Sequence, residues 1–279
     1  MSLVTDLDSF PSVRYALGFL GADKASASSK GLLRGLIFGV ICLPPFFWLI
    51  LLLINTVSRP LYYQGNIYIV LAPRMFLHSV LGAVVPFVAY MFLLQYSQKT
   101  DHFVKVVTEA TTSNPMLPST LGHYGRRLEI AFMLVIFPTY SLVEILMAIL
   151  NTDYSNLFDL LYALVTVLSA PLHILLVVCA SFIFTALAFT VILDINHFVS
   201  VLPGTELDAA STYWHRIYNT LRSCSRHTGV FLATLVCVTS LRWSLQISQS
   251  VITGSPPGLG TAAVFLLMMT VLLRVGAWV

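Results

Sequence analysis

Residues 160–193 read LLYALVTVLSAPLHILLVVCASFIFTALAFTVIL, which is 34 consecutive residues without one Asp, Glu, Lys or Arg. A transmembrane α-helix needs about 20 mostly apolar residues, because the hydrocarbon core of a bilayer is about 30 Å thick. At a rise of 1.5 Å per residue, this stretch forms a helix of about 51 Å, which is longer than that core. The stretch therefore predicts a transmembrane helix with one end that projects into water.

The chain as a whole has the composition of a membrane protein. Of its 279 residues, 57% are hydrophobic and only 10% are charged, whereas a typical soluble domain has roughly 25% charged residues. Residues 1–279 are therefore predicted to form a single transmembrane domain, an all-α polytopic bundle of about six helices. The stretches long and apolar enough to span a membrane are 35–56, 75–95, 128–150, 160–193, 230–250 and 260–277.

The basic residues orient these spans, because Lys and Arg collect in loops that stay in the cytoplasm. All of them except Arg59, Arg74 and Arg242 fall on one predicted side of the membrane. We therefore expect a multi-pass protein of the plasma membrane with both termini in the cytoplasm.

The segment TYWHRIYNTLRSCSRHTGVF, residues 212–231, is amphipathic before the fifth span begins. At helical spacing one face carries His215, Asn219, Arg222 and Arg226, and the opposite face carries Tyr213, Ile217, Leu221, Cys224 and Thr228. We expect a cytoplasmic extension of the fifth helix, packed against DINHFVSVL, residues 194–202, which extends the fourth. A helix lying on anionic lipid is the alternative.

The chain carries no motif of an enzyme. GxSxG, HExxH, P-loop and Gly-rich dinucleotide patterns are all absent from the sequence, and the four cysteines have no metal-ligand spacing. The formal charge of +3 is slight. We expect no catalysis, no cofactor, no metal and no nucleic-acid partner; the partners expected are the lipid bilayer and a small-molecule ligand.

Glu144, in the third span, is the clearest candidate for a functional residue, since ionisable residues inside a membrane are costly. It could meet a cationic ligand, an ion, or Arg242 near the end of the fifth span. Other polar and aromatic residues lie at a similar depth, and such convergence between helices predicts a small-molecule pocket. The predicted ligand-binding residues are His78, Glu144, Tyr162, Trp243 and Gln246. A structural ion pair, interfacial aromatics and interhelical hydrogen bonds are the alternatives.

Two segments resemble the arthropod gustatory receptors. FPSVRYALGFLGADK, residues 10–24, is similar to their N-terminal segment, a short apolar helix that ends in a Leu-Gly pair before the first span. The long fourth span and residues 194–231 resemble their cytoplasmic helical region. The resemblance implies a tetrameric ligand-gated cation channel, with the extensions forming an anchor between subunits and the ligand among the outer halves of the second to sixth helices.

One feature of that family has no counterpart. Its seventh helix lines the pore and carries Thr-Tyr and Gln-Phe pairs, whereas this chain stops at LLRVGAWV, residues 272–279. We therefore expect a chemoreceptor subunit, in a homo- or hetero-tetramer, that lacks the last helix and does not conduct alone. The alternatives are a non-conducting scaffold or partner subunit, a small-molecule transporter, for which an internal repeat is missing, and a G-protein-coupled receptor, which needs seven helices and an outer N-terminus.

Overall fold

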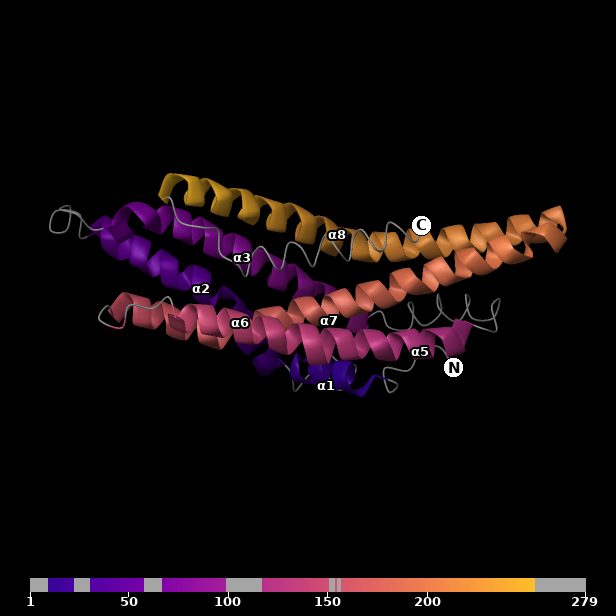
Figure 1. The fold of residues 1–279 in the computed structure, drawn as a ribbon, viewed down its shortest axis with the longest axis horizontal. Helices are drawn as coiled ribbons and strands as arrows, with labels where there is room; N and C mark the ends of the chain where they lie inside the picture. The colour runs from indigo at the N-terminus through magenta and orange to yellow at the C-terminus, as the bar shows by residue number, and fades with distance from the viewer. Residues whose placement is uncertain are drawn as a thin grey trace.

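The computed structural model describes residues 10–22, 31–57, 67–98, 117–150, 154 and 157–253. In that part of the chain every regular element is a helix, and the helices form an elongated bundle (Figure 1). The elements are α1 (Pro11–Phe19), α2 (Gly31–Val57), α3 (Ile67–Gln98), α5 (Leu117–Glu129), η2 (Ile130–Ile136), α6 (Phe137–Leu150), α7 (Leu157–Val201), η3 (Leu202–Gly204) and α8 (Leu207–Thr253).

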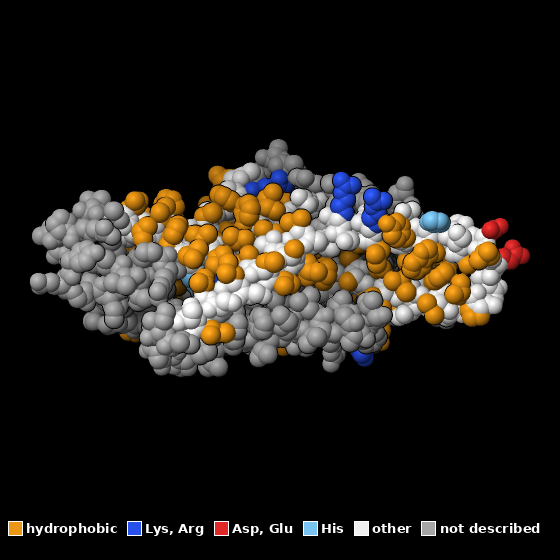
Figure 2. All heavy atoms as spheres, turned by 90° about the horizontal axis from the view of Figure 1, so that it is seen from above, with side chains coloured by type: hydrophobic (Ala, Val, Ile, Leu, Met, Phe, Trp, Pro, Cys, Tyr) orange, Lys and Arg blue, Asp and Glu red, His pale blue; other side chains and the backbone are white. Residues whose placement is uncertain are grey.

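Four of the described helical segments are long and apolar enough to cross a membrane, or up to five if the two halves of α8, bent by 50° to one another, count as one span. For the described residues, this confirms the prediction of an all-helical architecture with several potential membrane spans. The sixth predicted stretch, 260–277, lies outside the described residues. Hydrophobic side chains cover much of the described surface in Figure 2, and acidic side chains lie at the end where α7 meets α8.

The helix that contains the third predicted span is longer than the apolar stretch 128–150: it begins at Leu117 and runs without interruption through α5, η2 and α6. Apolarity marks where a chain enters a membrane, whereas a helix ends only where its backbone hydrogen bonds end. Within it, η2 is a π-helix in which the Phe137 N–H donates to the Phe132 carbonyl. Pro138 follows directly and has no N–H to donate, which favours such a wider turn.

The helices α7 and α8 form a hairpin that reaches beyond the described ends of the other helices (Figure 1). They contain 45 and 47 residues, each more than twice the length that a bilayer requires. Tyr213 Oη donates a 2.9 Å hydrogen bond to Asp194 Oδ1, and the rings of Phe198 and Tyr213 pack edge to face at 5.1 Å. The predicted contact between the two extensions is confirmed; the side of the membrane on which they lie stays a prediction.

The predicted division of the α8 faces is confirmed with one exception. His215, Asn219, Arg222 and Arg226 are exposed. Ile217 and Thr228 are buried, but Leu221 is 45% exposed and Thr220 is buried in its place. The buried face is therefore rotated toward Thr220, because Leu221 lies at the edge of the predicted face.

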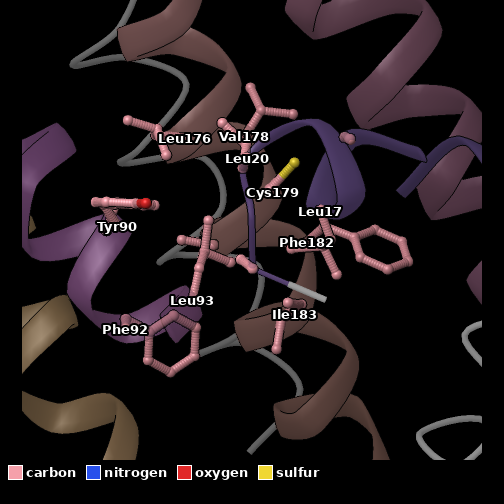
Figure 3. Close-up of a cluster of buried hydrophobic side chains, with 14 of the residues drawn as sticks. Leu17, Leu20, Tyr90, Phe92, Leu93, Leu176, Val178, Cys179, Phe182 and Ile183 are labelled. Carbon is pink, nitrogen blue, oxygen red and sulfur yellow. The ribbon is translucent and has the colours of Figure 1, made fainter. Parts of the chain in front are cut away.

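The short N-terminal helix α1 is part of the core. Leu17 and Leu20 lie among side chains of α3 and α7, including Leu93 and Phe182 (Figure 3). The backbone N–H of Ser12, in the first turn, donates to Glu129 Oε1 at 2.8 Å. This acceptor satisfies one of the N–H groups that a helix leaves unpaired at its N-terminus.

The predicted Leu-Gly end of this helix is present. Gly21 follows Leu20 with φ of +63°, a conformation that glycine adopts without steric cost. Its carbonyl accepts a 3.2 Å hydrogen bond from Arg34 Nε on α2. The turn therefore ties α1 to the first predicted span.

Candidate functional site

A cavity of about 260 Å³ lies where α3, α6, α7 and α8 meet, and Pro44 of α2 also lines it. Its charged and polar lining residues are His78, Ser79, Tyr140, Glu144, Tyr162, Thr166, Ser169, His173, Thr239 and Arg242. Its apolar lining includes Val85, Pro86, Ile136, Ala170, Ile174, Val177, Val178 and Leu235. A mostly apolar cavity with a few convergent polar groups is the usual form of a small-molecule site.

Two opposite charges reach this cavity from different helices. Glu144 belongs to α6 and Arg242 to α8, and their charges attract one another. In the described part of the chain no ion pair within 4.0 Å joins them, and the buried Nε of Arg242 has no hydrogen-bond partner there. The two side chains therefore interact electrostatically but do not form an ion pair.

The Arg242 guanidinium lies next to Gly82 on α3. A Cβ built on Gly82 would lie 3.5 Å from Cζ of Arg242 and 3.6 Å from each terminal nitrogen. These distances are ordinary van der Waals contacts, so an alanine at position 82 would fit beside the guanidinium. A larger side chain at position 82 would occupy the space that the guanidinium fills.

Hydroxyl groups on the wall of the cavity are oriented by their own helices. Thr166 Oγ1 donates to the Tyr162 carbonyl at 2.9 Å, and Ser169 Oγ donates to the Val165 carbonyl at 2.8 Å. Thr239 Oγ1 donates in the same way to the carbonyl four residues before it. Since each hydroxyl has used its proton, the oxygen lone pairs remain to accept hydrogen bonds from a ligand.

Aromatic and imidazole groups complete the lining on α7. The Tyr162 ring lies 5.3 Å from the Trp48 ring and 6.0 Å from the Phe47 ring, both on α2. These contacts fix the Tyr162 side chain at the cavity wall. Farther along α7, the buried Nε2 of His173 has no hydrogen-bond partner in the described residues.

The structure brings together three of the five predicted site residues. His78, Glu144 and Tyr162 line the same cavity, together with Arg242, which the sequence indicated as a partner for Glu144. Trp243 and Gln246 lie on α8, and their side chains are outside what the structure describes. Whether these residues bind a ligand stays a prediction.

Sequence reasoning missed Ser79, Tyr140, Thr166, Ser169 and Thr239. On α7 the signal was present, because Tyr162, Thr166, Ser169 and His173 follow one another at intervals of four, three and four residues. That spacing places four polar residues on one face of an otherwise apolar helix. The described residues contain no group of three or more His, Cys, Asp or Glu able to hold a metal ion.

Comparison of the chain with protein-family models, with curated proteins and with solved structures finds no match. The chemistry of the cavity is the basis on which a function is assigned.

Proposed function

We propose that the chain is a membrane receptor that binds a small molecule in this cavity and works as a gustatory-type chemoreceptor subunit of a ligand-gated cation channel. The observation that carries the proposal is the convergence of Glu144, Arg242, His78 and His173 on one cavity from four helices. Ionisable residues inside membrane helices are costly and mark ligand or ion pathways. Glu144 and His78 fall within apolar segments long enough to span a bilayer.

The proposal includes an orientation and an assembly. We place the chain in the plasma membrane with the α7–α8 hairpin and both termini in the cytoplasm, because the basic residues gather on that side. Arg222 and Arg226 on the hairpin are exposed, as a hairpin in water requires. The subunit would assemble as a homo- or hetero-tetramer.

Ligand binding by the purified full-length chain in lipid nanodiscs is the test, since binding does not require one chain to conduct ions. Sugars, bitter compounds and amino acids are screened by their effect on thermal unfolding. A ligand at about 100 times its Kd stabilises the folded state by about 2.7 kcal/mol. A scaffold subunit without a ligand site would show no stabilisation by any of them, and that result would refute the proposal.

A cavity-filling variant localises the binding. Ala170 lines the cavity, and Ala188 lies on the same helix, is similarly half-buried and does not line it. We expect Ala170→Phe to abolish the stabilisation and Ala188→Phe to preserve it. Equal stabilisation of both variants would place the ligand elsewhere.

A further inference from the structure

We infer that the cavity takes a small zwitterion, an amino acid whose ammonium and carboxylate are separated by a short apolar chain. The inference rests on the proposed function and names the ligand class of the same site. It begins from the opposite charges that Glu144 and Arg242 bring to one cavity without forming an ion pair.

Each of these charges lacks a full partner. A carboxylate or guanidinium removed from water is costly unless it is paired and hydrogen-bonded. Attraction between the two charges offsets part of this desolvation cost, but the buried Nε of Arg242 still has no acceptor in the described part of the chain. A ligand carboxylate would supply acceptors to Arg242, and a ligand ammonium would supply donors to Glu144.

The balance of charge favours a ligand that is neutral overall. Glu144 and Arg242 contribute one negative and one positive formal charge to the lining. An amine alone would compensate Glu144 and leave Arg242 unpaired, whereas a carboxylic acid alone would do the reverse. Only a molecule that carries both charges pairs both groups.

The hydroxyl groups fit the same ligand. An ammonium has three N–H donors, and one carboxylate does not satisfy all of them. The hydroxyls of Thr166 and Ser169 donate to α7 carbonyls, so in this arrangement their oxygens offer a ligand lone pairs and no free proton. They therefore suit the ammonium end of a ligand and not its carboxylate end.

The size and the apolar lining limit what joins the two charges. The cavity volume of about 260 Å³ lies just below the roughly 300–1,000 Å³ of pockets for drug-sized molecules. Val85, Pro86, Ile174 and Val178 provide apolar surface in the same cavity. A chain of a few methylene groups matches this surface, whereas a polyol would leave hydroxyl groups unpaired against it.

The first experiment compares ligands on the unmodified full-length chain in nanodiscs by calorimetric titration. The probes are glycine, 3-aminopropanoate, 4-aminobutanoate and 5-aminopentanoate, with butylamine, butanoate and butane-1,4-diol as matched single-charge and neutral controls. We expect at least one amino acid to bind roughly tenfold to a hundredfold more tightly than every control, because each charged hydrogen bond adds binding free energy. A control that binds as tightly as the best amino acid would overturn the inference.

Charge-removing variants form the second experiment. Glu144→Gln and Arg242→Gln should each weaken the binding of the best amino acid by roughly tenfold to a hundredfold. Glu144→Gln should not weaken butanoate binding, since butanoate has no ammonium and the variant removes a negative charge that repels its carboxylate. The matched controls are Glu206→Gln and Arg222→Gln, which alter exposed residues of the hairpin and should leave every affinity unchanged. Unaltered amino-acid binding by both cavity variants would also overturn the inference.

The outcomes separate this inference from the proposed function. Binding of butylamine, butanoate or the diol alone, abolished by Ala170→Phe, would refute the zwitterion and leave the ligand site in place. Amino-acid binding that survives Ala170→Phe, or no binding by any compound in either experiment or in the wider panel, would refute both.

Discussion

Replacing Tyr213 by Phe removes a single hydroxyl group from the α7–α8 hairpin. That hydroxyl donates a 2.9 Å hydrogen bond to Asp194 Oδ1, and Asp194 is only 1% exposed. The other oxygen, Oδ2, has no partner in the described residues. The variant therefore leaves a buried carboxylate without the hydrogen bond that the hairpin provides.

The magnitude follows from the kind of bond that is lost. Hydrogen bonds to charged groups contribute about 1.5–3 kcal/mol, so the free energy of unfolding should fall by about 2 kcal/mol. The ring itself stays: its contact with Phe198 at 5.1 Å does not depend on the hydroxyl, and Arg216 Cζ, 4.3 Å from the ring centroid, keeps the ring face although it loses its contact with the hydroxyl. Phe presents a similar face to both neighbours.

Denaturant unfolding of the purified chain in mixed micelles measures this loss. Tyr218→Phe is the matched control, because Tyr218 lies on the same helix and is 49% exposed. Together with the single variant Asp194→Leu, the double variant Asp194→Leu/Tyr213→Phe completes a cycle whose coupling free energy should be about 2 kcal/mol, since removing both partners leaves neither end of this hydrogen bond unpaired. A cost for Tyr213→Phe no greater than that for Tyr218→Phe would refute the reasoning.

Two further substitutions test the core. Glu129→Ala removes the acceptor of the Ser12 N–H. We expect the free energy of unfolding to fall by about 1–3 kcal/mol and amide exchange in α1 to become faster. The exposed control Glu206→Ala should change neither. Leu93→Ala empties a site that is 0% exposed and should lower the free energy of unfolding by about 2–5 kcal/mol. Leu77→Ala, at a position 47% exposed, should cost much less, and equal costs for the two would contradict the described core.

Much of the helical architecture could be predicted from the sequence, because long apolar stretches have few alternatives to a helix in a membrane. The length of α7 and the pairing of the two extensions followed from residues 160–202 and the amphipathic stretch after them. The start of the third helix at Leu117 did not follow, since α5 is helical without being apolar. The sequence also contains no indication of the π-helical turn before Pro138 other than the proline itself.

The candidate site was predictable only in part. Glu144 and Arg242 could be identified because charges are rare within apolar stretches, although 98 positions separate them in the sequence. The role of Gly82 depends on how α3 and α8 face one another, which no local pattern encodes. The contact between Glu129 and α1 likewise links residues that only the tertiary fold brings together.

The most direct test of the central claim, a ligand-accessible cavity inside the helical bundle, compares two equally buried threonines on α8. Thr239 is 6% exposed and lines the cavity, whereas Thr220 is 4% exposed and lies on the hairpin, outside the cavity. Each is replaced by Cys in full-length chain whose native cysteines have been changed to Ala, and the rate of modification by a small water-soluble thiol reagent is measured in nanodiscs. We predict that Thr239→Cys reacts faster than Thr220→Cys. A bound ligand should slow the reaction of Thr239→Cys and leave the reaction of Thr220→Cys unchanged. Equal rates, or a rate at position 239 that no ligand changes, would contradict the account.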